Sequence, residues 1–343
     1  MMKQKRTPGL FDEDIRLNKI SKQGDPLEKL KSMIKWESFR KIIEKVFDIE
    51  SKGPGGRPRY DVILMFKILI LQRYYNISDE QVEFQILDRL SFMRFLDLNI
   101  RDDVPDHNTI WLFRESLINA EIIEKLFEQF EKELRKNDLI ANKGSIVDAS
   151  FVEVPKQRNT KEDNDKINNN EVPEEWKNST NKLSHKDLDA RWVTKNKKRF
   201  YGYKNHIKVD IKSKLITKYD TSDAALHDSQ KISNLLDKKD NGKPLFADSA
   251  YSGKPISDQL SKRFIINKIH EKGYRGHPLT EKQKERNRKK SKIRARVEHV
   301  FGFMEYVMNG MYLRVIGHKR VRAMIGLMNL TYNMFRYMTL AVK

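Results

Sequence analysis

The chain has 343 residues, and its 68 Lys and Arg outnumber its 48 Asp and Glu, which gives a formal charge of +20 at pH 7. A surplus of that size favours a polyanionic partner, because basic side chains release counterions from a phosphate backbone, although a merely soluble basic protein is the simpler alternative. The absence of cysteine excludes disulfides, a thiol nucleophile and cysteine metal sites, and it suits a reducing cytoplasm.

Neither a targeting segment nor a membrane span is predicted. Positions 1–6 are charged, but no apolar stretch follows them as it would in a signal peptide. The longest apolar run, 62–71, is broken by Lys67 and is too short to cross a bilayer. We therefore expect a cytoplasmic protein with no membrane partner.

Residues up to about 138 carry the signals of helices. Asp25 and Pro26 are typical of a helix start, as N-cap and first helical residue. Ser78 and Gln81 have the spacing of a capping box. Apolar residues recur at helical spacing over 36–47, 60–75, 79–90 and 120–136. We predict an all-helical domain over 1–138 that begins with a loose polar arm of some twenty residues.

A Gly- and Pro-rich segment interrupts this helical part at 51–59. Its composition is typical of a loop, since glycine and proline break both helices and strands. Arg57 and Arg59 lie in it and are candidate contacts to DNA phosphates.

The pattern changes at 144–151, which we take as the central strand of a second domain. Ile146 and Val147 are adjacent and β-branched, as in a strand whose two faces are both buried. Asp148 would stand at the far edge of this strand. An isolated Asp in that position is more often a turn or cap residue, so a functional role depends on partners further along the chain.

The remainder predicts a mixed sheet with flanking helices over 139–343. A polar stretch at about 155–199 has the composition of a partly disordered insertion. A hairpin follows over 203–219, and a short apolar run at 245–247 ends at Asp248. A stretch crowded with Lys and Arg, 282–296, then leads into a helix that carries Glu298 and has one apolar face.

Three carboxylates can meet in such a domain. Parallel strand ends would bring Asp148 and Asp248 together, and the last helix would add Glu298. Carboxylates without cysteine or a histidine cluster suit hard cations, Mg²⁺ or Mn²⁺. We expect these three to lie close enough to share ions, and to lie further apart when no cation is bound, because like charges repel. Taken singly, each has a structural alternative: Asp248 as a turn residue, and Glu298 as the partner of Arg294 four residues earlier.

These positions lie in blocks that resemble a known family. The segments 146–150, 247–251 and 294–302 resemble the Asp, Asp and Glu blocks of DDE transposases, and the insertion-sequence five family of bacteria is the most similar group. Segments 201–206 and 227–229 resemble further blocks of that family, and 56–60 and 104–109 resemble its helical N-terminal part. The likeness extends over roughly 10–340.

The resemblance implies an RNase H-like catalytic domain, preceded by the helical domain, in an enzyme that moves an insertion sequence. Asp148, Asp248 and Glu298 would hold two divalent ions, Mg²⁺ or Mn²⁺. The enzyme would cut the element's ends, and the freed 3′-hydroxyl would attack target DNA by transesterification. The last helix departs from the wider group, because Ser291 stands where Tyr is usual and Glu305 where Lys is usual.

The resemblance also implies double-stranded DNA as partner, both terminal inverted repeats and target DNA, with a homodimer assembled on it. The helical domain would help recognise the element's ends. Besides Arg57 and Arg59, the candidate DNA-binding residues are Lys204, His206, Lys289, Lys290, Lys292, Arg294 and Arg296.

Three alternatives are open. The chain could be a non-catalytic DNA-binding repressor derived from a transposase, although its three acids are intact. Tyr251 could be the nucleophile of a tyrosine recombinase, but the Arg and His residues that such an enzyme needs are not found at suitable positions, so packing or DNA contact is preferred. His206, His227 and His299 could bind a metal, but no helical or hairpin spacing pairs them.

Overall fold

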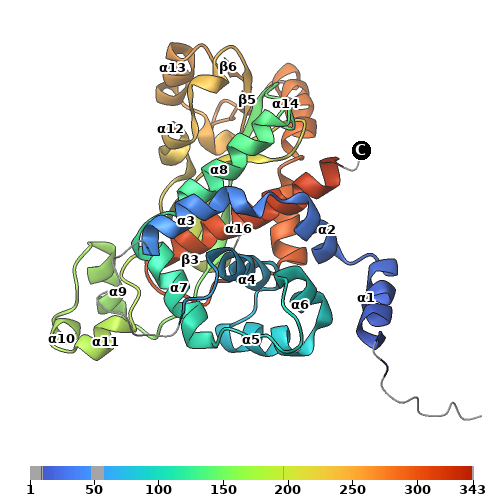
Figure 1. Cartoon of the computed structure of the whole chain (residues 1–343). Coiled ribbons are helices and arrows are strands. Elements are labelled where there is room, and N and C mark those ends of the chain that lie inside the picture. The colour runs from blue at the N-terminus through green and yellow to red at the C-terminus, as the bar shows by residue number, and fades with distance from the viewer. Residues whose placement is uncertain (1–8, 10, 48–57, 196, 342–343) are drawn as a thin grey trace, which may run out of the picture. The chain divides into compact units, whose positions relative to one another are not determined.

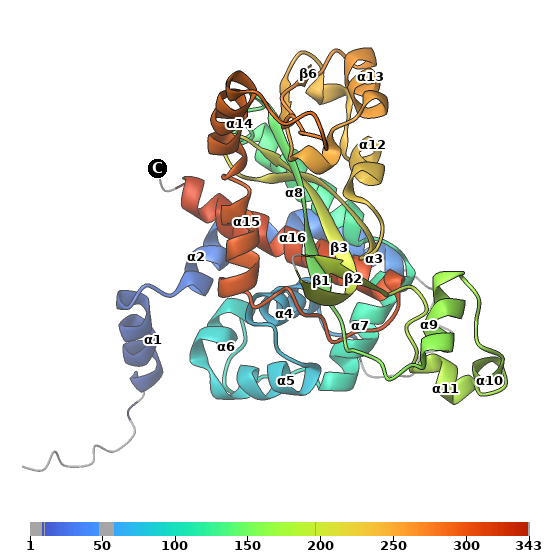
Figure 2. The same ribbon diagram turned by 180° about the vertical axis from the view of Figure 1, so that it is seen from behind.

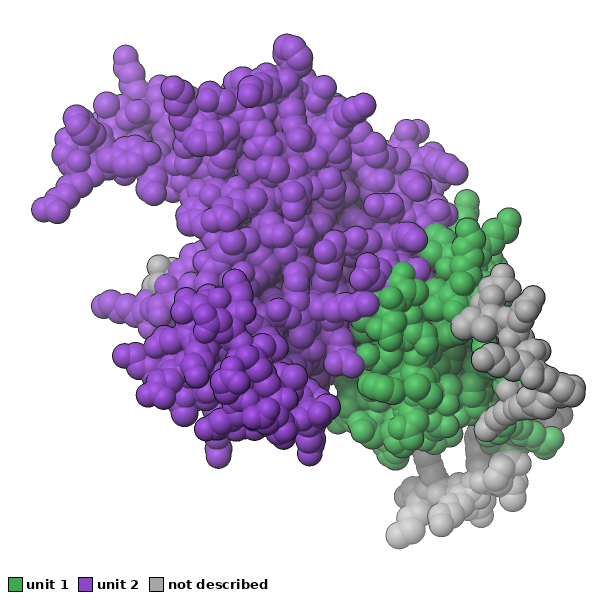
Figure 3. All heavy atoms as spheres, turned by 90° about the vertical axis from the view of Figure 1, so that its left-hand side faces the viewer, with its two compact units in different colours: residues 1–72, 77–120 green, residues 73–76, 121–343 purple. Residues whose placement is uncertain are grey.

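The computed structural model describes residues 9, 11–47, 58–195 and 197–341. The chain divides into two compact units, one formed by residues 1–72 and 77–120 and the other by residues 73–76 and 121–343, coloured separately in Figure 3. Apart from residues 73–76, the second unit begins at residue 121, whereas the sequence predicts a domain boundary at 138. Each unit is described separately below.

The first unit is helical in its described part. Its helices are α1 (Asp12–Lys22), α2 (Pro26–Met33), the 3₁₀ turn Trp36–Phe39, α3 (Arg40–Phe47), α4 (Val62–Tyr75, whose last turn belongs to the second unit), α5 (Asp79–Asp88), α6 (Leu90–Leu96) and α7 (His107–Asn119). Two helix starts are confirmed: the carboxylate of Asp25 accepts from the Leu27 amide, and Ser78 and Gln81 form a capping box. The predicted loose arm is wrong over 12–22, where α1 forms.

The second unit is built on a six-stranded mixed sheet (Figures 1 and 2). Its strands are β1 (Ser145–Glu153), β2 (Arg191–Lys195), β3 (Lys198–Asp210), β4 (Ile216–Asp223), β5 (Pro244–Phe246) and β6 (Ile266–Asn267). Strand β3 pairs antiparallel with β1, β2 and β4, whereas β5 pairs parallel with both β1 and β6. Four strands joined by antiparallel pairs, β1 to β4, are continued by the two parallel strands β5 and β6, and this mixed sheet with its flanking helices forms an RNase H-like fold, as predicted.

Strand β1 lies at the centre of this sheet. Ile146 and Val147 both have 0% of their surface exposed, so both faces of the strand are covered. Val147 lies in one apolar cluster with residues of α12 (Ile232–Leu235), α13 (Lys254–Lys262) and β5. Asp148 is the fourth residue of a nine-residue strand. It therefore does not stand at the far edge of the strand, because pairing with β3 continues to Glu153.

Two long helices, α8 (Ile123–Lys136) and α16 (His318–Ala341), pack against each other, and α16 also packs on β4. Polar side chains fix this packing, since Asn329 of α16 bonds Asn205 of β3 at 2.8 Å and Asn333 accepts from the Ile216 amide at 2.9 Å. Although α16 has 24 residues, no described helix is both long and apolar enough to cross a membrane.

The polar insertion is more ordered than its composition predicts. It contains three short helices, α9 (Lys161–Asn168), α10 (Glu174–Lys177) and α11 (Thr180–Ser184), and then strand β2. Two apolar side chains hold it, Ile167 with 4% and Trp176 with 1% of the surface exposed. A few well-placed apolar residues are therefore sufficient to organise a segment that looks disordered on average.

Candidate active site

Strand register brings the two aspartates side by side. In the parallel pair, Ile146 of β1 stands opposite Phe246 of β5, and Asp148 and Asp248 each follow two residues later. Both side chains are intermediate in exposure, at the point where β5 has ended. The Asp248 carboxylate accepts from the Ala250 amide at 2.9 Å and caps a short 3₁₀ turn, so the predicted structural role as a turn residue is also fulfilled.

The third acid is placed by a break between two helices. Helix α14 (Glu281–Arg294) ends, a turn follows, and Glu298 is the first residue of α15 (Glu298–Gly302). Val297 and Val300 are fully buried and fix the start of α15 against the rest of the unit. The Glu298 side chain remains 61% exposed, so its carboxylate points outward from a well-anchored backbone.

One guanidinium connects two of the three carboxylates. Arg294 donates to Asp148 at 2.7 Å and lies 3.5 Å from Glu298. The sequence indicates the second contact through its four-residue spacing, but no local pattern indicates the first. Arg294 was predicted to contact DNA, and in this structure it neutralises the acids.

Burial sets the charge state of Asp148. Removal from water raises its pKa to about 6, Arg294 and the Ala149 amide lower it, and repulsion from Asp248 and Glu298 raises it. The three carboxylates are thus close enough to affect one another's ionisation. A carboxyl group whose pKa is raised beside other acids is typical of functional sites, although structural ion pairs also perturb pKa values.

The three carboxylates are not grouped around a common point in this structure. Among the residues that the structure describes, no three His, Asp or Glu side chains are grouped so as to hold a metal ion. That the three carboxylates share ions once a cation is present stays a prediction. Their chemistry nevertheless fits a hard cation, since all donors are carboxylate oxygens and a cationic group already lies between two of them.

The basic residues of α14 differ in availability. Lys289 is 76% exposed and pairs with Glu285, and Lys292 is exposed and has no ion pair with any residue that the structure describes. Lys290 instead donates to the Ile269 carbonyl at 2.8 Å and is only 15% exposed. Arg296, beyond the helix, is exposed and bonds the Ile211 carbonyl. Lys289, Lys292 and Arg296 therefore remain available to a phosphate, and Lys290 has a structural contact.

Two other predicted DNA contacts need correction. His206 has 0% of its surface exposed, and burial lowers its pKa to about 4, so a neutral ring bonds Ser222 at 2.8 Å. Lys204 is 8% exposed and pairs with Asp228 at 2.8 Å. Neither side chain reaches the surface, because both lie on an inward face of β3 with partners on later segments.

The loop candidates belong to the first unit. Arg59 is exposed, donates to the Phe47 carbonyl at 2.7 Å and lies over the Phe47 ring. It thus has a structural contact, which its sequence neighbourhood does not indicate. Arg57 lies outside the described residues.

Tyr251 is fully buried in the apolar cluster beneath the acids. Burial and the nearby charges of Asp148, Asp228 and Asp248 raise its pKa well above the usual value. A hydroxyl held neutral and covered cannot reach a DNA strand, so the preferred packing role is the one that the structure supports. Of the histidines considered as ligands, His227 bonds its neighbour Ser229 at 2.7 Å and His299 is exposed.

Comparison with protein families identifies the chain. Residues 141–334 match the family described as "Transposase DDE domain", and residues 15–116 match "Transposase domain (DUF772)". The first match covers more than half of the sequence, so the chain belongs to the DDE transposase family. It is a DNA transposase, an enzyme of a family that acts with divalent metal ions.

Among solved structures, the chain is similar to the piggyBac transposase in a synaptic complex with hairpin DNA, determined by cryo-EM. The identity is 12%, the match covers 92% of this chain and 75% of that chain, and the TM-score is 0.45. A likeness at this distance does not extend to individual residues.

Proposed function

We propose that Asp148, Asp248 and Glu298 are the catalytic carboxylates of an insertion-sequence transposase of the insertion-sequence five family. The observation that carries this proposal is the register of β1 and β5: Ile146 pairs with Phe246, and the two aspartates each follow two residues later, Asp148 within β1 and Asp248 just after β5. Their sharing of one electrostatic environment with Glu298 supports it.

The three carboxylates would hold two divalent ions, Mg²⁺ or Mn²⁺. Such ions would supply charge that activates the attacking oxygen and stabilises the leaving oxygen of the DNA strand. Arg294 neutralises Asp148 and Glu298 before ions bind, because it contacts both. Its guanidinium, released from these contacts, would then be in position to pair with a DNA phosphate.

The reaction would be cleavage at the ends of the element, followed by attack of the freed 3′-hydroxyl on target DNA. Residues 1–138 would recognise the terminal inverted repeats and 139–343 would perform the chemistry, on double-stranded DNA bound by a homodimer. The family matches of the two parts support this division, since separate transposase models cover 15–116 and 141–334.

Cleavage of an oligonucleotide that carries the element's end, with Mg²⁺ or Mn²⁺, tests the proposal. We expect single alanine variants of Asp148, Asp248 and Glu298 to lose cleavage, and a double variant to be hardly worse, because the residues act as a unit. DNA binding should persist in all of them. A wild-type protein that binds the ends but cuts with neither metal would instead fit the repressor alternative.

Exposed basic residues near α14 would bind phosphate. Charge reversal of Lys289 and Lys292 should weaken DNA binding broadly and flatten its dependence on salt, since phosphate contacts carry no sequence information. Lys290→Ala is the matched control, because its ammonium is bonded to Ile269 and its loss should affect stability more than the salt slope. An unchanged slope in the Lys289 and Lys292 variant would assign these residues to a solvated helix face.

A further inference from the structure

The helix that begins at Glu298 continues into a π-helical segment and carries an exposed tyrosine. Helix α15 continues directly into a π-helical segment, Phe303–Val307, and π turns are rare and often occur at functional sites. Tyr306, two turns after Glu298, is 81% exposed. Its ring leans back along the helix, since a Cβ on Gly302 would lie 4.0 Å from its Cδ2 atom.

Gly302 has no steric reason to be glycine. Its backbone angles, φ −61° and ψ −37°, are helical, and an added Cβ would meet nothing closer than 4.0 Å. Gly310 and Gly326 differ, because a Cβ there would lie 2.7 Å from Met328 and 2.4 Å from Tyr219. Glycine inside a helix destabilises it relative to alanine, so Gly302 calls for another explanation.

A hollow of about 400 Å³ lies at this glycine, lined by Glu298, His299, Gly302, Phe303 and Val307. Its lining therefore combines an aromatic ring, an apolar side chain and an imidazole with the candidate catalytic carboxylate. No Lys or Arg lines it, so its chemistry does not suit a phosphate. An aromatic base or a deoxyribose matches these walls, and the absence of a Cβ lets such a group approach the helix backbone.

We propose that this hollow is a nucleoside subsite, which takes an unpaired base of the DNA beside the phosphate to be cut, with the Tyr306 ring as its stacking partner. The proposal rests on the assignment of Glu298 to catalysis. Stacking on an aromatic side chain is tolerant of sequence, because every base has a π-face. The subsite would thus position the strand without reading it.

Fluorescence of a base analogue tests the subsite without catalysis. The full-length protein, in EDTA, is mixed with a pre-nicked duplex of the element's end that carries 2-aminopurine next to the cleavage site. We expect the wild type to quench the analogue. Tyr306→Ala should lose most of the quenching and bind this base about tenfold more weakly, whereas Tyr306→Phe should retain it. Tyr274→Ala, which removes a Tyr that is 63% exposed elsewhere, is the control.

Gly302→Ala gives a readout of opposite sign. It should raise Tm by about 1–3 °C, since the helical backbone accepts alanine, and should still reduce quenching because the methyl group fills the hollow. A merely structural Gly302 would lose stability and quench normally.

Unchanged quenching in both Tyr306→Ala and Gly302→Ala would overturn the subsite. The catalytic assignment is judged separately, by Mg²⁺-dependent cleavage in the wild type and its loss in Glu298→Gln. Glu298→Gln should still quench in EDTA, because the carboxamide keeps the wall of the hollow. Quenching together with normal cleavage by Glu298→Gln would refute the proposed function and leave the DNA subsite standing.

Discussion

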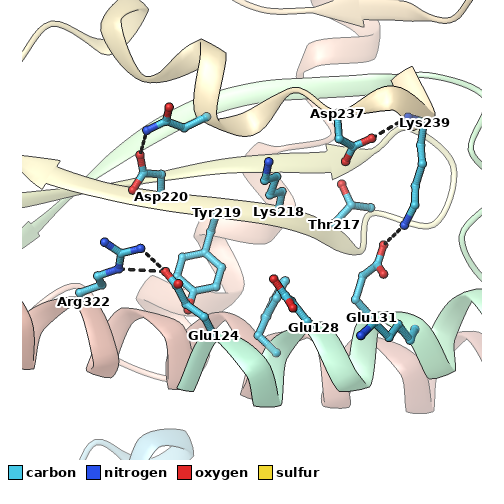
Figure 4. A pocket seen from close by; sticks show the side chains of 13 residues that line it. Glu124, Glu128, Glu131, Thr217, Lys218, Tyr219, Asp220, Asp237, Lys239 and Arg322 are labelled. Atoms are coloured by element: carbon cyan, nitrogen blue, oxygen red, sulfur yellow. Dashed lines mark hydrogen bonds and ion pairs between the residues drawn. The ribbon is translucent and has the colours of Figure 1, made fainter. Parts of the chain in front are cut away.

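Two acid-rich regions of the catalytic unit differ in how their charges are balanced. A pocket of about 520 Å³ lies between α8, β4 and the segment around Asp237, and Figure 4 shows its side chains. Four of its five acids each pair with a different cation: Arg322 with Glu124, Lys239 with Glu131 at 3.7 Å, Lys231 with Asp220 at 3.1 Å and Lys208 with Asp237 at 2.8 Å. Lys208 also pairs with Asp240, outside the pocket, at 2.8 Å. At the candidate active site, one guanidinium serves both Asp148 and Glu298.

The pKa values of the acids differ between the two regions in the same way as their pairing with cations. Burial would raise the pKa of Asp220, but hydrogen bonds from Asn234 and Lys231 outweigh it and the pKa is lowered; Lys208 has the same effect on Asp237. Burial prevails at Asp148 and its pKa rises. The number of acids and the size of a cavity therefore do not identify the active site. What distinguishes the candidate active site is its unbalanced carboxylate charge, because such a site gains most from a bound cation.

The largest expected effect separates the two regions by activity. Asp148→Ala should reduce Mg²⁺-dependent strand cleavage by at least about 1,000-fold, because metal ligands act together. Asp220→Ala should leave the cleavage rate within about threefold, yet lower stability by roughly 1–3 kcal/mol since Asn234 and Lys231 lose their partner. Rates on the element's end and thermal unfolding are measured for both. Equal loss of cleavage would erase the distinction between the regions.

The next effect concerns the shared guanidinium. Arg294 lowers the pKa of Asp148, so Arg294→Gln should move that pKa above its present value of about 6. Cleavage needs the ionised carboxylate, and its pH profile should therefore shift to higher pH, with several-fold lower activity at pH 7. NMR titration of the Asp148 carboxyl carbon without metal measures the pKa directly. A pKa that stays constant or falls would contradict the role given to Arg294.

The ionised Asp148 carboxylate should lower the stability of the folded state at neutral pH. Its pKa of about 6 exceeds the unfolded value, about 3.9, so its favourable contribution is present below pH 4 and disappears as the pH rises through 6. Asp148→Asn mimics the protonated acid and should stabilise the metal-free protein at pH 7–8 by roughly 3 kcal/mol, at about 1.4 kcal/mol for each of about two pKa units. Denaturation in EDTA measures it, and the gain should vanish near pH 4. A gain independent of pH would have another cause.

The smallest effect lies in the pocket. Lys239 is 50% exposed and pairs with Glu131 at 3.7 Å, so Lys239→Ala should change stability by at most about 1 kcal/mol and leave cleavage unchanged. Urea unfolding and the cleavage assay provide the measurements. A strong loss of activity would show that this pocket takes part in the reaction.

The fold was predictable where local signals agree with tertiary structure. Adjacent Ile146 and Val147 predict a strand buried on both faces, and the structure has it. The apolar spacing after Glu298 predicts the buried side of its helix, and Val300 and Met304 are fully buried. The positions of Asp248 after its short strand and of Glu298 on its helix were readable from the sequence. That of Asp148 within its strand was not, because the length of β1 is set by its pairing with β3, which continues to Glu153.

Contacts between distant segments were not predictable. The bond from Arg294 to Asp148 depends on where α14 ends relative to β1, which no spacing records. Lys204 and His206 look like surface residues in the sequence, but Asp228 and Ser222 satisfy them inside. Composition likewise conceals the role of Ile167 and Trp176, the two buried side chains that hold the insertion.

The register of β1 and β5 fixes the separation of the Asp148 and Asp248 backbones. Neighbouring strands are held about 4.8 Å apart by their hydrogen bonds, however much chain connects them. The insertion between β1 and β2, which carries α9, α10 and α11, can therefore lengthen, shorten or be exchanged without altering the separation that the register sets. Such a construction gives related elements freedom to diversify one loop region while their chemistry stays constant.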